Sequence, residues 1–144
     1  MRKIFLLTLC LSPFLLLAQE TYSGMWQKVD TLISIKNYKE TIPALEAIKT
    51  KAKAEKNSPQ WIRAVLAGHF ALTTNQDDEQ AFTSINSHFS QAIKNANPTE
   101  KALLQNFYAQ YLSGQIYRYS AAKTDAFTGG STEQKIAIID SLFQ

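Results

Sequence analysis

Cysteine is almost absent from this chain of 144 residues, in which Cys10 is the only one. It lies in an N-terminal segment that we expect to be removed, so the mature chain would have none. A chain without cysteine has no disulfide bonds, no thiolate metal ligands and no thiol nucleophile. A mature domain of about 125 residues must then be held together by its apolar core, for which this length is sufficient.

Glycine and proline are also scarce, with five and four residues, and they lie almost entirely at the boundaries of apolar segments. No run of residues alternates between apolar and polar side chains as a half-buried strand does. Between the boundaries, apolar residues recur every three or four positions, which is the period of an α-helix. The sequence therefore predicts an all-α fold.

The first nineteen residues, 1–19, have the layout of a secretory signal peptide. Two basic residues at positions 2 and 3 precede an apolar run, and Ala18 is a small residue near its end. The run contains Pro13 and is about fourteen residues long, whereas a membrane-spanning helix needs roughly 20. We therefore expect cleavage after Ala18 or Gln19, no stable membrane span in the mature chain, and export to the periplasm, the cell envelope or the medium.

Cys10 allows one alternative, a lipoprotein signal in which this cysteine carries lipid. The residues from Leu7 to Cys10 loosely resemble a lipidation box, but Leu9 stands where a small residue is usual. Few apolar residues precede the cysteine, fewer than a signal peptide normally has. A leader cysteine that is discarded on cleavage is therefore the favoured interpretation, and lipidation is the alternative.

The basic excess of the chain belongs mostly to the leader. Fifteen lysines and arginines against twelve acids give a net charge of +3, and loss of Arg2 and Lys3 reduces it to +1. The high isoelectric point is therefore no argument for nucleic acid, which is not expected as a partner. The densest basic cluster is interleaved with Glu46 and Glu55 and is predicted to be a solvated helix face, with an anionic partner as the alternative. Its members are Lys49, Lys51, Lys53 and Lys56.

Six helices are predicted, covering about residues 24–35, 38–56, 59–74, 79–96, 98–123 and 132–143. Pro43 lacks a backbone N–H, so it either bends the second helix or delays its start to Thr41. Four helix starts have residues that satisfy free backbone N–H groups. These are Asn37 with Glu40, Ser58 with Pro59, Asn97 with Glu100, and Ser131 with Gln134.

Each predicted helix has an apolar stripe that we expect to be buried. The third helix is apolar nearly all round and rich in small residues, so it is expected to lie between neighbours that approach closely. A leucine at Gly68 would overpack that contact. The stripes are Trp26, Val29 and Ile33; Ile42, Leu45, Ile48 and Ala52; Ile62, Val65, Leu66, Phe70 and Thr73; Phe82, Ile85, Phe89 and Ile93; Leu103, Leu104, Phe107, Tyr108, Tyr111, Leu112 and Tyr119; and Ile136, Ile139, Leu142 and Phe143.

Successive helices are predicted to pair as antiparallel hairpins that begin near residues 24, 59 and 98. The period of about 35–39 residues lies in the range of tetratricopeptide-like (TPR-like) repeats, although the consensus of that repeat is not present in order. We therefore predict a helical-hairpin array over residues 20–144. The sixth helix stays apolar up to Phe143 and lacks the polar outer face of a terminal unit. This predicts the leading part of a longer protein, or an edge that needs a partner and causes self-association.

No catalytic, cofactor or metal site is predicted. His69 and His88 have no second ligand three or four residues away, and both are interpreted as hydrogen-bonded helix histidines. No serine or threonine lies at a sharp glycine-flanked turn beside a base. A carboxylate pair that meets only in space stays open as an alternative. We expect no enzyme activity.

Two further features have functional alternatives. The backbone N–H groups of Gly129, Gly130 and Ser131 would suit an anion, but a loop followed by a cap is favoured. The tyrosines of the fifth helix, with Arg118, would suit a stacking platform for sugar or peptide, but a core stripe is favoured. They are Tyr108, Tyr111, Tyr117 and Tyr119.

One set of residues resembles a known family. It includes Met25-Trp26-Gln27-Lys28-Val29, Leu32, Lys36-Asn37, Ala44-Leu45-Glu46, Ile48, Ala52-Lys53-Ala54-Glu55-Lys56-Asn57, Gln60, Ile62, Arg63, Ala64, Pro98, Ala102, Leu103, Leu104 and Tyr108. Together they resemble the N-terminal helical region of large exported alpha-2-macroglobulin-like proteins of Bacteroidetes. The leader ending Leu17-Ala18-Gln19 is also typical of that phylum.

The resemblance implies a role in a protease-trapping endopeptidase inhibitor of the cell envelope. Such proteins carry macroglobulin-type β-domains, a bait region and sometimes a thioester motif downstream, none of which lies in this sequence. No functional residue of the family falls in this stretch. We therefore expect an exported helical scaffold whose partners are proteins: downstream domains of the same polypeptide, an envelope protein, or proteases. A free-standing helical-repeat binding protein is the alternative.

Overall fold

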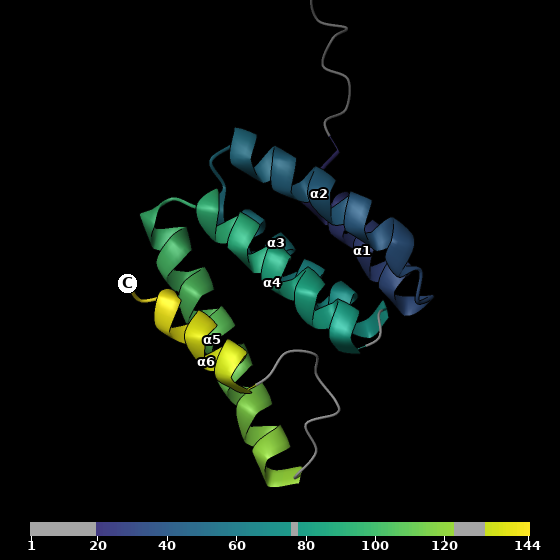
Figure 1. Ribbon diagram of the computed structural model, residues 1–144. Coiled ribbons are helices and arrows are strands. Elements are labelled where there is room, and N and C mark those ends of the chain that lie inside the picture. Colours follow the sequence, from purple (N-terminus) through teal and green to yellow (C-terminus); the bar gives the residue numbers. More distant parts are fainter. Residues whose placement is uncertain (1–19, 76–77, 123–131) are drawn as a thin grey trace, which may run out of the picture.

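The computed structural model describes residues 20–75, 78–122 and 132–144. All regular secondary structure in these ranges is α-helical (Figure 1): α1 Tyr22–Ser34, α2 Tyr38–Ala54, α3 Ser58–Asn75, α4 Asp78–Lys94, α5 Pro98–Ala122 and α6 Thr132–Ser141. The predicted all-α fold is confirmed. The predicted leader at residues 1–19 and the loop and cap predicted at Gly129, Gly130 and Ser131, with the anion site as their alternative, lie outside the described residues.

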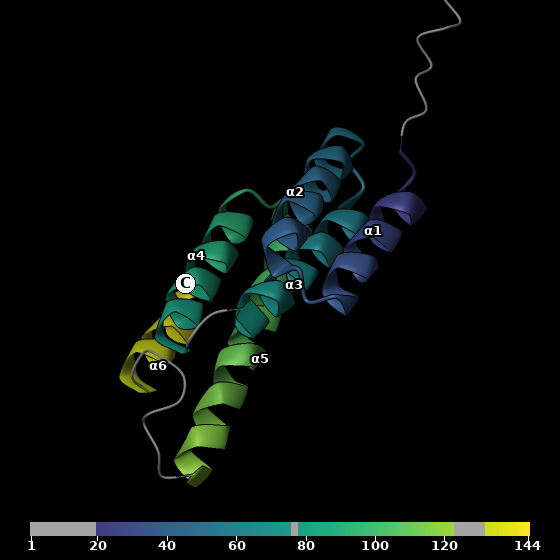
Figure 2. The same ribbon diagram turned by 90° about the vertical axis from the view of Figure 1, so that its right-hand side faces the viewer.

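The central helix of the molecule is α3. Each helix packs against the next one in the sequence, most extensively α2 against α3, and α3 also contacts α5. Figure 2 shows α1 on one side of the molecule and α4 with α6 on the other, with α3 between them. The structure around α3 therefore decides how α2 and α4 are placed.

Small residues of α3 let its neighbours approach closely, as predicted. Ala64, Gly68 and Ala71 are buried, and a Cβ atom at position 68 would lie 2.8 Å from Cε1 of His88 in α4. The outer part of the predicted stripe is wrong, since Phe70 is 51% exposed. The buried positions of α3 include small residues that were outside the predicted stripe, as well as Trp61 and Val65.

The turns before α2 and α3 are built alike. Lys36 and Lys56 have left-handed backbone angles, with φ of 58° and 54°. In each turn the next residue, Asn37 or Asn57, donates its backbone N–H to a carbonyl five residues earlier, at 2.8 Å in both cases. This bond closes the end of a helix, and each asparagine then caps the helix that follows.

The start of α3 differs from the prediction. Asn57 accepts a hydrogen bond from the backbone N–H of Gln60, at 3.3 Å, whereas Ser58, the expected cap, is the first residue of the helix. The left-handed turn at Lys56 delivers Asn57 directly to the capping position, so Ser58 continues into the first turn.

The start of α2 is not delayed by Pro43, which lies inside the helix. The side chain of Asn37 accepts from the N–H of Glu40, and the hydroxyl of Thr41 donates to the carbonyl of Asn37, at 2.9 Å. The predicted cap is confirmed and the alternative start at Thr41 is wrong. Because the backbone N–H groups of its first turn are satisfied in this way, α2 tolerates the loss of the one backbone hydrogen bond that Pro43 cannot donate.

The buried side chains form two clusters. One joins α1, α2 and α3, and the larger one joins α3, α4 and α5 to the end of α2. The predicted stripe of α5 is only half right, since Leu103 and Phe107 are exposed. The first cluster is Met25, Trp26, Val29, Leu45, Ile48 and Ala64; the second is Ala52, Trp61, Val65, Ala81, Ile85, Phe89, Ala92, Leu104, Tyr108 and Leu112.

The last helix, α6, is rotated relative to its predicted stripe. Ile139 and Leu142 pack against the larger cluster, but Ile136 and Phe143 are exposed. Lys135 is buried instead, with its Nζ 5.8 Å from the ring centre of Phe82 in α4. A cation over an aromatic face is favourable, and this position was not predicted to be inside.

Candidate functional site

A groove separates α2 from α4, and α3 forms its floor. Its wider part has a volume of about 450 Å³, and a second hollow of about 310 Å³ continues along the same two helices. The two parts share Glu46, Lys49, His88 and Gln91, so they form one groove. The remaining lining of the wider part is Ile42, Leu45, Ala64, Gly68, Leu72, Thr83, Ser84 and Ser87, and that of the second hollow is Thr50, Lys53, Trp61, Ala92 and Asn95.

The groove is long enough for a short stretch of extended chain. Its lining runs from Ile42 to Lys53 on α2 and from Thr83 to Asn95 on α4. At 1.5 Å per helical residue, this corresponds to roughly 17 Å. An extended chain advances about 3.3 Å per residue, so about five residues would fit along it.

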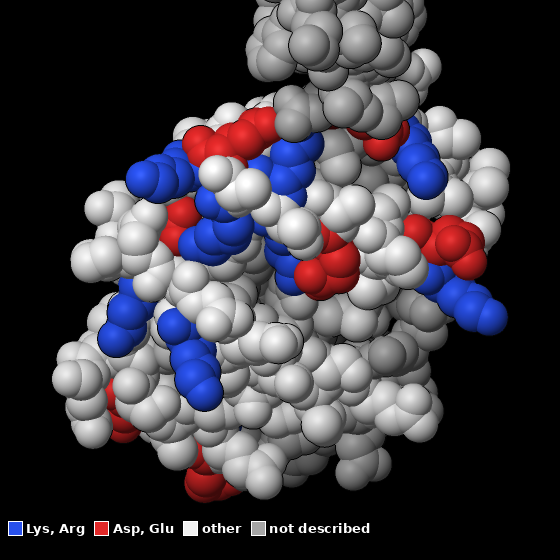
Figure 3. All heavy atoms as spheres, turned by 90° about the horizontal axis from the view of Figure 1, so that it is seen from above, with Lys and Arg blue, Asp and Glu red and all other residues white. Residues whose placement is uncertain are grey.

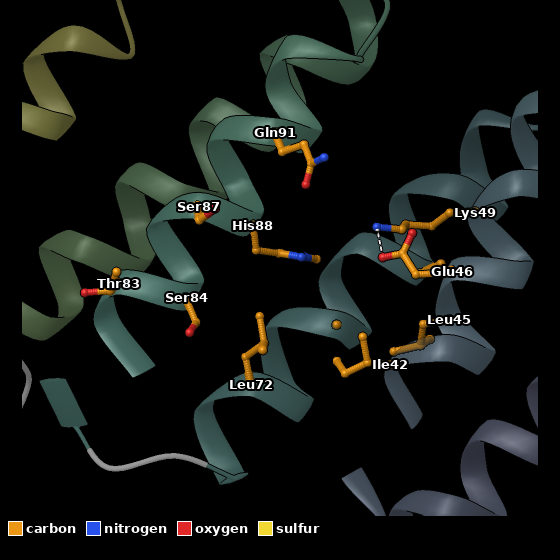
Figure 4. A pocket seen from close by; sticks show the side chains of 12 residues that line it. Ile42, Leu45, Glu46, Lys49, Leu72, Thr83, Ser84, Ser87, His88 and Gln91 are labelled. Atoms are coloured by element: carbon orange, nitrogen blue, oxygen red, sulfur yellow. Dashed lines mark ion pairs between the residues drawn. The ribbon is translucent and has the colours of Figure 1, made fainter. Parts of the chain in front are cut away.

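The wider part of the groove has an apolar end and a polar middle. Figure 4 shows the apolar side chains of Leu72, Ile42 and Leu45 gathered at one end. Toward the middle, His88 extends from α4 toward α2, where Lys49 and Glu46 lie. The lining therefore offers contacts for an apolar side chain and, next to it, for a polar or charged one.

Lys49 and Glu46 form an ion pair across one turn of α2, with 2.5 Å between Nζ and Oε1. The two side chains differ in exposure: that of Lys49 is 18% exposed and that of Glu46 is 56% exposed. A solvent-exposed pair of this spacing contributes only about 0.2–0.5 kcal/mol. The glutamate is therefore held weakly over a more deeply placed cation.

His88 is fixed at the groove by a hydrogen bond to the backbone of α3. Its Nε2–H donates to the carbonyl of Val65, at 2.8 Å, so the neutral ring carries its hydrogen on Nε2 and has Nδ1 as acceptor. Burial lowers the pKa of His88, and the bond to Val65 only partly offsets this. The predicted hydrogen-bonded histidine is observed here.

His69 lies outside the groove, in a cluster of aromatic rings. Its ring centre is 4.4 Å from that of Tyr111, 5.4 Å from that of Phe89 and 6.1 Å from that of Phe107. Its Nδ1 is buried without a hydrogen-bond partner. Burial, and secondarily the nearby His88, lower the pKa of His69 to about 4. For this Nδ1 the predicted hydrogen bond is wrong, because apolar rings surround it.

Acidification is expected to destabilise the fold through His69. The unfolded state takes up a proton near pH 6.5, whereas the folded state does so only near its pKa of about 4, so stability present above pH 6.5 is lost between these values. Partial exposure limits the loss to about 2 kcal/mol, less than the full linkage value. Urea unfolding at pH 7 and pH 4.5 should give a smaller difference for His69→Gln than for the wild type. Equal differences in the two proteins would contradict this assignment.

The basic cluster of α2 is paired with carboxylates. Besides the pair at Lys49, Lys51 contacts Glu55 at 2.7 Å and Lys53 contacts Glu100 at 2.6 Å. Figure 3 shows lysine and arginine side chains intermixed with acidic ones over the upper face of the molecule. The predicted interleaving with Glu46 and Glu55 is therefore present in two ion pairs, and the pair of Lys53 with Glu100 in α5 was not predicted.

The tyrosine platform considered for α5 is not open at Tyr108. This side chain is buried, stacks on Phe89 with 4.5 Å between ring centres, and donates its hydroxyl to Oδ1 of Asn86, at 3.0 Å. Tyr111 is half-buried. The side chains of Tyr117, Arg118 and Tyr119 lie outside the described part of the structure. For Tyr108 the core interpretation is confirmed.

Sequence reasoning missed the groove, because its walls come from α2 and α4. Lys49, Ser87 and Gln91 have no sequence signature that joins them. The only usable signal is the run of small residues in α3, where the missing side chain at Gly68 makes room for the ring of His88. Within the described ranges, His, Cys, Asp and Glu form no group of three suited to a metal ion, and each helix is too short or too polar to cross a membrane.

The sequence matches no protein-family model and no curated protein. The fold matches no solved structure.

Proposed function

We propose that the chain is an exported helical scaffold that binds an extended peptide segment of a partner protein between α2 and α4. It has no chemistry of its own. The observation that carries this proposal is the groove of about 450 Å³, which continues past His88 into the second hollow. Ligand sites in proteins are concave, mostly apolar with a few placed polar groups, and largely formed before binding.

The bound segment would lie along the groove as extended chain. Ala64 is buried and Gly68 is covered by the ring of His88, so the segment would lie over His88 and between the two walls. The walls add hydroxyl and amide groups from Ser84, Ser87 and Gln91, which suit backbone N–H and carbonyl groups. Grooves between helices that accept a short segment are a recurring mode of peptide recognition.

We further propose that the helices form antiparallel hairpins, α1 with α2, α3 with α4 and α5 with α6, in a TPR-like array. Support comes from the packing of consecutive helices and from the short turns at Lys36 and Lys56. Short connections favour antiparallel neighbours. In such arrays the space between units serves as an extended binding surface.

The absence of catalysis is proposed from what the two histidines do. His88 is bonded to the backbone of Val65, and His69 is packed among aromatic rings. Neither is paired with a nucleophile, which a catalytic histidine would activate. Both positions are explained by packing alone.

Export rests on the leader predicted at residues 1–19, and the setting rests on the resemblance to alpha-2-macroglobulin-like proteins. In that setting the bound segment would belong to another domain of the same polypeptide, to an envelope protein or to a protease. The gene sequence beyond codon 144 tests this. Macroglobulin-type β-domains in the same frame would support the inhibitor, and a stop codon there would leave a free-standing binding protein.

Blocking the groove should abolish binding of peptides selected on the protein. Ser87 and Ser90 are both exposed on α4, but only Ser87 lines the groove. Random dodecapeptides displayed on phage are selected on the wild-type domain, and the strongest binder is synthesised and labelled. Its Kd, measured by fluorescence anisotropy, should rise at least tenfold in Ser87→Trp and stay unchanged in Ser90→Trp.

Equal binding of the selected peptide by Ser87→Trp and Ser90→Trp would contradict the proposal. Failure of the selection to yield any groove-dependent peptide would count against it as well. Circular dichroism of both variants shows that the tryptophan has not unfolded α4.

A further inference from the structure

In the polar middle of the groove, the carboxylate of Glu46 occupies the position on Lys49 that the carboxylate of a ligand could take. Glu46 places its carboxylate on Nζ of Lys49 at 2.5 Å. The glutamate side chain is mostly in solvent, whereas the lysine side chain is mostly covered. A pair between neighbouring turns of one exposed helix face is weak, so Glu46 can turn away into water while Lys49 stays in place.

Lys49 is the cation of the groove that is best placed for an outside carboxylate. The other lining lysine, Lys53, is held at 2.6 Å by Glu100, a carboxylate whose side chain is only 3% exposed. Glu100 is buried and this pair joins α2 to α5, so Lys53 is held by a carboxylate that cannot turn away into water as Glu46 can. Of the two lysines that line the groove, Lys49 is therefore the one on which an outside carboxylate can replace the present partner.

Other groups near Lys49 suit a carboxylate. Figure 4 shows His88 and Gln91 projecting from α4 toward Lys49 and Glu46. The amide of Gln91 supplies neutral donors, and a carboxylate accepts several hydrogen bonds at once. Two walls of the groove thus offer donors to the same place.

The carboxylate would belong to a side chain rather than to a chain end. The groove does not stop at Lys49, since its second hollow continues along Thr50, Lys53 and Asn95. A peptide can therefore run past Lys49 in both directions. On one side lies the apolar end made by Ile42, Leu45 and Leu72, which suits a leucine-sized side chain.

From these observations we infer that the groove recognises an extended peptide segment in which an aspartate or glutamate follows or precedes an apolar residue. The acidic side chain exchanges with Glu46 on Lys49, and the apolar side chain fills the end at Leu72. Glu46 is then an internal competitor that keeps Lys49 paired until the segment arrives. This inference rests on the proposed function, because it names the segment that the groove takes.

Three pools of acetylated and amidated hexapeptides test the inference without interference from charged chain ends. Each pool combines leucine and serine with one further residue type: glutamate, glutamine or lysine. The pools compete with the labelled peptide selected above, at low and at physiological salt. The glutamate pool should bind about tenfold more tightly than the glutamine pool, the lysine pool should bind most weakly, and salt should reduce the differences.

Variants locate the recognition at Lys49. Lys49→Gln should remove the preference for glutamate over glutamine, and Glu46→Gln should strengthen glutamate binding about threefold. Lys51→Gln is the matched control, because Lys51 lies on the same helix, has a side chain 19% exposed, and pairs with its own glutamate at 2.7 Å outside the groove. It should leave the preference intact.

Equal binding of the glutamate and glutamine pools would overturn this inference and leave the peptide groove standing. Tightest binding of the lysine pool would overturn it too, because Glu46 rather than Lys49 would then recognise the peptide. If Lys51→Gln lost the preference for glutamate as fully as Lys49→Gln, the preference would depend on the overall charge of the protein and not on Lys49, which would contradict the inference. If no pool competes, the inference fails, whereas the proposed function is decided by the tryptophan variants of Ser87 and Ser90.

Discussion

Replacing Gly68 by leucine should lower the free energy of unfolding by about 1–3 kcal/mol, the usual cost of overpacking a filled core. A Cβ atom at this position would lie 2.8 Å from Cε1 and 3.2 Å from Nε2 of His88. The histidine ring cannot move away without losing its bond to Val65. The new side chain would therefore break that bond or push α4 away from α3.

Gly114 provides the matched control for this change. It also lies inside a helix, α5, but no atom outside its own helical backbone lies within 4 Å of a Cβ built there. Gly114→Leu should therefore stabilise the protein by up to about 0.8 kcal/mol, since leucine is the better helix former. Urea unfolding of both variants gives opposite signs if Gly68 marks a close contact. Stabilisation by both leucines would show that the face of α3 at Gly68 is open.

A double substitution tests whether the ring of His88 causes the destabilisation by Gly68→Leu. In a His88→Ala background the ring that meets the new side chain is gone, so Gly68→Leu should cost at least about 0.5 kcal/mol less than in the wild type. A cost that is the same in both backgrounds would mean that other groups, rather than His88, are displaced.

Replacing Glu100 by alanine should cost about 2–3 kcal/mol, because this buried carboxylate accepts hydrogen bonds from a lysine and from a backbone N–H at the helix start. It accepts from Nζ of Lys53 at 2.6 Å and from the backbone N–H of Asn97 at 2.9 Å. Burial raises the pKa of Glu100, but Lys53, Asn97 and Ser58 together outweigh burial and hold the pKa below its ordinary value. The carboxylate therefore stabilises the folded state above the unfolded pKa, and this is lost as the pH falls through the folded pKa.

Glu40 is the matched control for Glu100. It occupies the same position of α2, three residues after the cap, but its side chain is exposed, and within the described ranges it forms no ion pair. Glu40→Ala should change the free energy of unfolding by no more than about 0.5 kcal/mol. Urea unfolding at pH 7 compares the two variants. If Glu100→Ala lowers the free energy of unfolding as little as Glu40→Ala does, the ion pair of Lys53 with Glu100 does not stabilise the packing of α2 against α5.

The helices were predictable because their signals are local. Asn97 and Glu100 lie three residues apart, and they form the reciprocal bonds of the predicted cap, each at 2.9 Å. The sequence has no sign that Lys53, far earlier in the chain, also binds Glu100. The same local signals misplace the cap of α3, because the left-handed angle at Lys56 is set by the turn and not by residue type.

Which face of a helix is buried was harder to predict than the helix itself. The period of apolar residues in α3 favours the large side chains, yet Phe70 is exposed and the small Ala64 and Gly68 are inside. In α6 the same rule misses the buried Lys135, whose cation lies over an aromatic ring. Periodicity counts apolar residues, whereas burial depends on which neighbours approach.

The groove itself has no local signal. It exists because α2 and α4 both pack on α3 while a gap remains between them, and its polar groups come from both walls. No spacing within one helix predicts that His88 faces Lys49 across that gap (Figure 4). The site therefore had to come from the structure.

Hydrogen exchange of the domain, with and without the glutamate hexapeptide pool, tests the peptide groove most directly. The pool should slow exchange of backbone amides in two segments, residues 42–53 of α2 and 83–95 of α4, which line the groove from either side. Amides of α1 and α6 should be unchanged. Protection confined to α1 or α6, or spread evenly over all helices, would contradict binding between α2 and α4.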